Sequence, residues 1–173
     1  NDNNNSKATV IDLCSGSGCI AITIKIKRKK WDIFALEKSK KAIKIAKRNS
    51  SRHLVNINYL NADIFSWDNC DEVDIIISNP PYIAESQKKF MKINVLNFEP
   101  EKSIFVPDEN PLIFYKRIFD FSKSKLKAGG LIYFEINPKF KDQLISLSNE
   151  YHFSSYELKK DIFKRNRYIK FQK

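Results

Sequence analysis

The segment "SNPPYI", Ser78 to Ile83, places an amide, two prolines and a phenol directly after the apolar run "VDIII". Each proline fixes its own φ and drives the preceding residue toward extended backbone. The backbone from Asn79 to Tyr82 is therefore largely preset. The Asn79 side-chain oxygen and the Pro80 carbonyl can then both accept hydrogen bonds from one planar NH₂ group, while the Tyr82 ring lies against its face.

This arrangement suits methyl transfer to an amide or aromatic amine nitrogen, whose delocalised lone pair makes it a weak nucleophile. Two acceptors hold such a nitrogen in line with the methyl group and stabilise the positive charge that it gains in the transition state. A sulfonium donor is also attracted to aromatic faces. A turn that merely ends a strand would explain Pro80 and Pro81 but not the flanking residues. We therefore interpret Asn79, Pro80 and Tyr82 as catalytic residues.

A second stretch whose residue types suggest a function is "DLCSGSGCIA", Asp12 to Ala21. It places Gly16 and Gly18 in a turn after a short β-rich run. Glycine tolerates positive φ and lets a ligand approach the backbone closely. The chain has only four glycines, so a turn that uses two of them is predicted to bind a ligand. The turn also satisfies the G-x-G-x-x-G/A pattern of dinucleotide sites, so a nicotinamide-binding protein stays open on this feature alone.

Two acidic residues follow the next two predicted strands. Glu37 lies about 20 residues beyond the glycines, where an acid can hold the two hydroxyls of a ribose. Asp63, in "NADIF" at the end of the third predicted strand, is placed to accept a hydrogen bond from an adenine amino group. Together with the glycine turn, these two acids predict a nucleoside pocket.

The elements that position these residues alternate between strand-like and helix-like patterns. We predict strands over 8–13, 31–37, 56–62, 73–78 and 129–136, helices over 19–27, 39–49, 111–126 and 140–151, and a closing pair of strands within 153–171. Ser39 is a predicted N-cap and Pro111 a predicted helix start. This order favours an α/β fold, with a mainly parallel sheet, helices on both faces and ligands at the carboxyl ends of the strands.

Composition narrows the class of protein further. The 173 residues fit one domain, with residues 1–7 as a linker or disordered N-terminus and 8–173 as the folded part. The net charge is +11, which attracts nucleic acid in general. The basic run "KIKRKK" has no interleaved aromatic residues, so we favour solvated faces instead. Three irregularly spaced cysteines predict neither a disulfide framework nor a zinc site, and no apolar run is long enough to span a membrane.

The motifs above belong to a longer series in which order and spacing matter. The series is "VIDLCSGSGCIAI", "SKKAIKIAKRN", "NADIF", "DIIISNPPYI", "FEPEKSIF", "LIFYKRI", "LKAGGLIYFEI" and "DIFKRNRYI". Over nearly its whole length the chain resembles the release factor N5-glutamine methyltransferases, the HemK/PrmC family. The resemblance implies a Rossmann-like class I methyltransferase fold, with a mostly parallel seven-stranded sheet, helices on both faces and an antiparallel C-terminal strand pair. It also implies transfer of a methyl group from S-adenosyl-L-methionine to the glutamine of the Gly-Gly-Gln motif in peptide chain release factors.

The same resemblance assigns site residues. It implies cofactor binding by Asp12, Cys14, Ser15, Gly16, Ser17, Gly18, Glu37, Asp63, Ile64 and Asn79. It implies that the target glutamine is gripped by Asn79, Pro80, Pro81 and Tyr82. We expect no metal, no membrane association and no nucleic-acid substrate. We further expect a monomer that modifies a release factor in the cytoplasm or in an organelle matrix.

Several positions depart from the pattern of that family. Cys14 replaces the first glycine of the loop, Glu37 stands where Asp is usual, and Asn137 and Lys164 stand where glycine is typical. The segment "FVPDENPL" also replaces a glycine-containing one. The family's N-terminal helical domain has no counterpart before Ala8, so we expect the catalytic domain alone.

Two alternatives stay open on the sequence. An amino-methyltransferase acting on adenine or cytosine of DNA or RNA would keep the chemistry, and the basic charge motivates it. A non-catalytic or nicotinamide-binding relative would use only the glycine turn.

Overall fold

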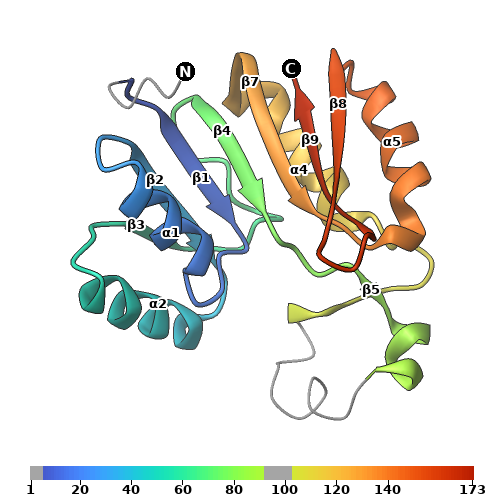
Figure 1. Ribbon diagram of the computed structural model, residues 1–173, viewed down its shortest axis with the longest axis horizontal. Helices are drawn as coiled ribbons and strands as arrows, with labels where there is room; N and C mark the ends of the chain where they lie inside the picture. The colour runs from blue at the N-terminus through green and yellow to red at the C-terminus, as the bar shows by residue number, and fades with distance from the viewer. Residues whose placement is uncertain (1–5, 92–102) are drawn as a thin grey trace.

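The computed structural model describes residues 6–91 and 103–173. Seven strands form one sheet in the order β3-β2-β1-β4-β7-β9-β8 (Figure 1). Their bounds are β1 Thr9–Leu13, β2 Asp32–Glu37, β3 Asn58–Asn61, β4 Val73–Ser78, β7 Leu126–Glu135, β8 Ser155–Lys160 and β9 Asn166–Gln172. The pairings from β3 to β7 are parallel, whereas β9 runs antiparallel to both β7 and β8. The mostly parallel sheet with an antiparallel C-terminal pair is confirmed.

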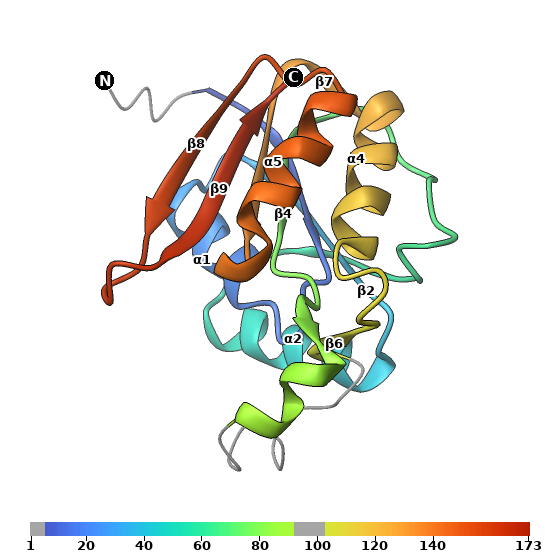
Figure 2. The same cartoon turned by 90° about the vertical axis from the view of Figure 1, so that its right-hand side faces the viewer.

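Helices cover both faces of the sheet, as predicted. Their bounds are α1 Cys19–Lys27, α2 Lys40–Arg52, α4 Ile113–Lys125 and α5 Lys141–Glu150. On the face next to α1 the core is aliphatic and includes Val10, Ile22 and Ile33. The helices α4 and α5 cover the other face (Figure 2), where the core is larger and rich in aromatic residues.

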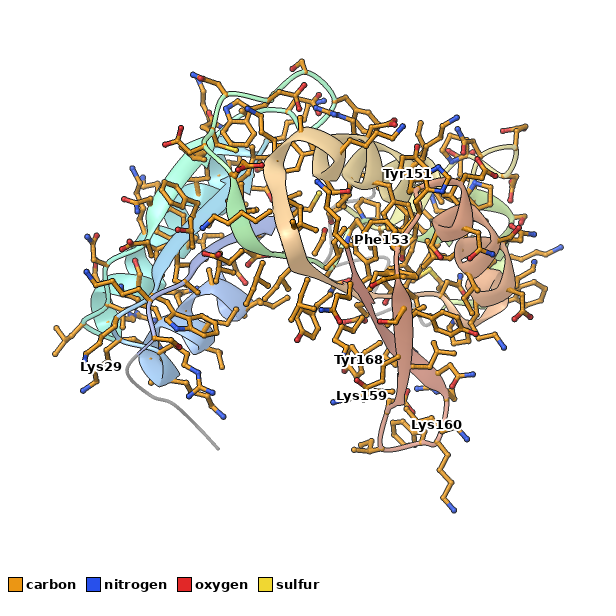
Figure 3. The ribbon with its side chains drawn as sticks, turned by 90° about the horizontal axis from the view of Figure 1, so that it is seen from above. Lys29, Tyr151, Phe153, Lys159, Lys160 and Tyr168 are labelled. Carbon is orange, nitrogen blue, oxygen red and sulfur yellow. The ribbon has the colours of Figure 1, made fainter. Side chains whose placement is uncertain are left out.

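Phe119 of α4 lies at the centre of the aromatic core. Its ring centroid lies 4.9 Å from that of Phe153, 5.1 Å from Tyr151, 5.3 Å from Phe171 and 5.6 Å from Phe134. Figure 3 shows Tyr151 and Phe153 on the side of α5 and β8. Tilted and edge-to-face ring contacts at these distances stabilise a core beyond simple burial. The cluster therefore fixes the end of β7, at Phe134, and the end of β9, at Phe171, against α4.

Helix starts differ in how well the sequence predicted them. The Ser39 hydroxyl accepts a hydrogen bond from the Ala42 amide at 3.2 Å, so the predicted N-cap of α2 is confirmed. The prediction for Pro111 is wrong, because α4 begins at Ile113. A turn in which the Ile113 amide donates to the Asn110 carbonyl at 3.2 Å holds Pro111 just before the helix.

Several short elements were not predicted from the sequence. β5 (Ile83–Ala84) pairs with β6 (Phe105–Val106) in a separate parallel sheet. The 3₁₀ segments η1 (Glu85–Phe90) and η3 (Pro138–Phe140) flank the ends of β5 and β7. Segments of two to six residues are too short for a periodic pattern to reveal.

Some predicted boundaries also shift. β7 begins three residues earlier than expected, and β3 is shorter at both ends. Of the predicted linker 1–7, residues 1–5 lie outside the described residues, as does 98–102 of "FEPEKSIF". In the part of the chain that the structure describes, no helix is long and apolar enough to cross a membrane.

Candidate active site

The sheet register brings the two motif-bearing turns together. Leu13, the last residue of β1, is the register partner of Ser78, the last residue of β4. The buried Ser78 hydroxyl donates to the Leu13 carbonyl oxygen at 2.6 Å. Cys14 and Asn79 therefore leave the sheet side by side, at the edge where β1 and β4 both end (Figure 1).

The turn after β1 is pinned to the end of β2. The Ser15 amide donates to the Leu36 carbonyl at 3.1 Å, and the Gly16 amide donates to the Glu37 Oε2 at 2.9 Å. The other oxygen of Glu37 accepts from the Ser39 amide at 2.7 Å. Glu37 thus joins the turn to the start of α2.

The two glycines of this turn have different surroundings. Gly16 has φ +54, and a Cβ built there would meet nothing within 4 Å. Gly18 has φ +80, and a Cβ there would lie 3.1 Å from both the Ala46 Cβ and the Tyr59 hydroxyl. Gly16 therefore borders open space, whereas Gly18 is required by packing between the turn and α2.

Two buried polar atoms below the turn have no partner among residues 6–91 and 103–173: Asp12 Oδ1 and Ser15 Oγ. The Asp12 Oδ2 accepts from the Ala21 amide of α1 at 3.2 Å. Burial raises the pKa of Asp12 to about 7; the Ala21 hydrogen bond opposes that rise and the Glu37 charge adds to it. Because buried polar atoms are nearly always paired, this pair fits a polar ligand seated on the turn.

Cys14 adopts φ +64, the left-handed region that costs a side-chain-bearing residue roughly 1–2 kcal/mol. This is the position where the sequence resemblance expects glycine. Burial raises the pKa of the Cys14 thiol to about 12. The thiol therefore stays protonated at neutral pH.

Asp63 and Ile64 continue the same edge beyond β3. Asp63 lies two residues after the end of β3 rather than at its end, because the strand stops at Asn61. The Lys38 ammonium contacts Asp63 at 2.7 Å and holds the pKa of that carboxyl below its usual value. Ile64 is buried, and its carbonyl accepts from Arg117 Nε at 2.7 Å.

The turn after β4 combines buried prolines with an exposed amide. Pro80 and Pro81 are buried, whereas Asn79 is exposed. Within the described residues no hydrogen bond engages the Asn79 side chain, so its donors and acceptor stay available. The Tyr82 hydroxyl donates to Glu135 Oε1 at 2.7 Å and accepts from Arg167 at 3.4 Å.

Asn137 contacts the backbone of Tyr82. Its Nδ2 donates to the Tyr82 carbonyl at 3.2 Å and to Gln87 Oε1 at 3.0 Å. Its Oδ1 accepts from the Lys139 amide at 3.1 Å and caps η3. Tyr82 is thus fixed at its hydroxyl by Glu135 and at its backbone by Asn137. Asn137, which the sequence showed only as a residue in a place where glycine is typical, therefore supports the proline turn.

The sequence did not assign Glu135, Asn137, Gln87 or Arg167 to the site. Glu135 and Asn137 could have been found, because Glu135 ends β7 and Asn137 follows it, and the carboxyl end of β7 lies at the same edge as those of β1 and β4. Gln87 and Arg167 come from η1 and β9 and carry no such signal.

A cavity of about 310 Å³ opens beside the proline turn. It is lined by Tyr82, Ile83, Gln87, Phe90, Met91, Asn137, Pro138, Arg165 and Arg167. The described residues hold no group of three or more His, Cys, Asp or Glu side chains that could bind a metal ion.

Comparisons with known proteins identify relatives of this chain. Residues 2–97 match the family described as "Methyltransferase small domain". The chain is 37% identical over 162 residues to a release factor glutamine methyltransferase of Bacteroides thetaiotaomicron, covering 92% of this chain and 58% of that protein. It is 36% identical to the protein of the same name from Flavobacterium psychrophilum, covering 93% and 57%. The chain thus spans less than two thirds of these relatives.

Solved structures show the same fold. A methyltransferase from Pyrococcus furiosus superposes with a TM-score of 0.73 at 14% identity, covering 96% of this chain and 75% of that one. A ribosomal protein L11 methylase from Lactobacillus delbrueckii gives a TM-score of 0.65 at 16% identity, covering 97% and 69%. The sheet and its helices are those of a Rossmann-like methyltransferase fold.

Proposed function

The chain belongs to the methyltransferase small domain family, and we propose that it methylates the glutamine side-chain nitrogen in the Gly-Gly-Gln motif of peptide chain release factors. The main observation that supports the proposal is the Ser78–Leu13 hydrogen bond, which holds the glycine turn beside the proline turn. The choice of substrate is supported by relatives that are named release factor glutamine methyltransferase. We propose 8–173 as the catalytic domain, acting in the cytoplasm or an organelle matrix.

The glycine turn and its neighbours would bind S-adenosyl-L-methionine. The open space beside Gly16 admits a ligand to the backbone, and the unpartnered Asp12 and Ser15 oxygens need a polar group. Glu37 would hold the ribose, and Asp63 with Ile64 would border the adenine. The residues of the turn, Cys14 to Gly18, would lie under the methionine and ribose. When bound, the cofactor supplies a methyl group activated by a sulfonium centre.

The proline turn would hold the acceptor nitrogen. Asn79 Oδ1 and the Pro80 carbonyl accept the two hydrogens of the glutamine NH₂ and orient its nitrogen toward the cofactor side. These acceptors also stabilise the positive charge that develops on the nitrogen, and buried Pro81 keeps the turn rigid. Burial, reinforced by the Glu135 carboxylate, raises the pKa of Tyr82. Tyr82 therefore stays a neutral phenol whose ring covers the planar amide.

Mass spectrometry of a release factor after incubation with this chain and S-adenosylmethionine tests the proposal. The expected result is one added methyl group on the glutamine of the Gly-Gly-Gln motif. A release factor in which that glutamine is replaced serves as the control and should stay unmodified. Cofactor binding without any modification of the glutamine would contradict the proposal.

A second candidate, transfer to an amino group of DNA or RNA, is favoured by one surface. The solvent side of α2 carries six exposed basic side chains and no acid: Lys40, Lys41, Lys44, Lys47, Arg48 and Arg52. Transfer of labelled methyl to nucleic acid in preference to the release factor would support this candidate.

A further inference from the structure

Large apolar side chains stand exposed on both sides of the candidate active site. Phe90, at the end of η1, is 79% exposed, and Ile162 and Phe163, in the β8–β9 turn, are 90% and 69% exposed. Such exposure is uncommon for large apolar residues that gather in one region, and it marks binding surfaces. The two segments are far apart in the sequence but lie at one edge. Because β9 runs antiparallel to both β7 and β8, β8 runs in the same direction as β7, and the β8–β9 turn lies at the edge where β7 ends (Figure 1).

The 310 Å³ cavity joins these segments to the proline turn. Phe90 and Met91 line it from η1, and Arg165 and Arg167 line it from β9 and the turn before it. Tyr82 lines the same cavity, and its hydroxyl accepts a hydrogen bond from Arg167 at 3.4 Å. The cavity is therefore continuous with the turn that would grip the target amide.

The β8–β9 turn is held in one conformation before any partner binds. The Asp161 carboxylate accepts hydrogen bonds from the Phe163 amide at 2.9 Å, the Arg165 amide at 3.0 Å and Arg165 Nε at 3.0 Å. The Arg165 guanidinium lies 5.0 Å from the centre of the Phe163 ring. A fixed aromatic residue and a fixed arginine are the residue types that dominate protein–protein binding energy.

We propose that this cleft, between the end of η1 and the β8–β9 turn, docks the polypeptide that flanks the target glutamine. The proposal rests on the proposed function and extends it to substrate recognition. Phe90 and Phe163 contact apolar side chains of the substrate loop on either side. The arginine donors that remain bind its backbone carbonyls, since a guanidinium presents five N–H groups. The docked chain then presents its amide to Tyr82.

The cleft combines exposed rings with arginines that are already paired, which favours a polypeptide over a nucleic acid. Asp161 lies 3.0 Å from Arg165 and 3.5 Å from Arg167, so both guanidinium groups are partly neutralised before a ligand binds. Phe90 and Phe163 add exposed apolar surface, which suits the apolar side chains of a polypeptide.

Two measurements on the whole chain test the docking surface. Fluorescence anisotropy gives the Kd of a labelled release factor in the presence of S-adenosylhomocysteine, and steady-state methylation gives KM and kcat. Phe90→Ala and Phe163→Ala remove exposed rings, so both variants should fold. Each is expected to raise Kd and KM about tenfold, the usual size of an interface hot-spot effect, with kcat at saturating substrate unchanged.

Leu54→Ala provides the matched control. Leu54 is 93% exposed and lines a different cavity together with Lys29. The same loss of apolar surface there should change neither Kd nor KM.

The possible outcomes separate the two proposals. If Phe90→Ala and Phe163→Ala bind and methylate the release factor as the unaltered chain does, the docking surface is wrong. If the unaltered chain binds it and the variants lose affinity, but the glutamine stays unmethylated, the docking surface is supported and the proposed function is wrong. If the variants lose affinity for an RNA oligonucleotide and keep it for the release factor, a polypeptide occupant is excluded.

Discussion

Two turns leave the sheet side by side, and they are built in opposite ways. The turn after β1 depends on backbone freedom, with φ values of +54 and +80 at its two glycines. Its external contacts come from the neighbouring strand, chiefly Glu37. The turn after β4 depends on restriction by two prolines, and its fixed residue Tyr82 is held by Glu135 and Asn137, more than 50 residues away.

The difference shows what each turn requires. A turn that must expose backbone amides to a ligand needs residues without a Cβ. A turn that must orient one carbonyl, that of Pro80, and one ring, that of Tyr82, needs a stiff backbone. It also needs hydrogen bonds to residues outside the turn. Changes in the first turn should therefore alter stability and cofactor affinity, and changes around the second should alter the rate of catalysis.

The largest effect is expected below the glycine turn, at Asp12. The folded protein keeps the Asp12 proton up to about pH 7, whereas the unfolded chain releases it near pH 4. The folded state therefore binds more protons in this range, and the free energy of unfolding should fall by about 4 kcal/mol between pH 4 and pH 7. Urea unfolding without cofactor measures this fall, and Asp12→Asn should flatten it. An equal pH dependence in both proteins would show that Asp12 titrates normally.

At the proline turn, Asn79→Ala should lower kcat about 10²- to 10³-fold, as the loss of one preorganised transition-state contact does. Asn79 is exposed, so the free energy of unfolding should stay within about 0.5 kcal/mol of the unaltered value. Single-turnover methylation of the release factor measures the rate. A variant with full activity would remove Asn79 from the chemistry.

Gly18→Ala should cost about 2–3 kcal/mol of stability, because strain at positive φ adds to crowding against α2. Gly16→Ala, with open space around it, should cost only about 1 kcal/mol. Its methyl group would instead enter the expected cofactor space and weaken binding of S-adenosylmethionine. Urea unfolding and calorimetry of both variants measure the two effects, and equal losses of stability would contradict the distinction.

Asn137→Ala should lower kcat about tenfold, since Tyr82 loses its backbone anchor worth about 1 kcal/mol. Asn137→Asp is the matched variant. It keeps the oxygen that caps η3 but cannot donate to the Tyr82 carbonyl. The aspartate variant should therefore lose rate as the alanine variant does. It should also lose stability, because its second buried oxygen would face the Tyr82 and Gln87 oxygens with no hydrogen between them. Full activity in Asn137→Asp would show that the cap alone matters.

The smallest effect is expected when glycine replaces a residue with positive φ in the β8–β9 turn, which lies beside the proposed docking cleft. Lys164, in the β8–β9 turn, has φ +62 and an exposed side chain. Lys164→Gly relieves left-handed strain but adds backbone entropy to the unfolded chain, for a net gain of about 0.5–1 kcal/mol. Urea unfolding measures this gain, and a loss of stability would mean that the turn tolerates lysine without strain.

The same contrast explains what the sequence could predict. The five parallel strands, the glycine turn, Glu37 and the proline turn were predicted because each carries a local pattern of apolar runs or special residues. The short β5–β6 pair was missed because two-residue strands have no period. The anchoring of Tyr82 was missed because Glu135 and Asn137 approach it only through the order of strands in the sheet. A single sequence does not reveal which long-range hydrogen bonds will form.

The Ser78 hydroxyl has a consequence for anyone who recombines such domains. It joins the end of β4 to the carbonyl that ends β1, so both strands together set the distance between the glycine turn and the proline turn. A chimera that takes only the turn after β1 from one protein would not keep that distance. The two strands should therefore be transferred together.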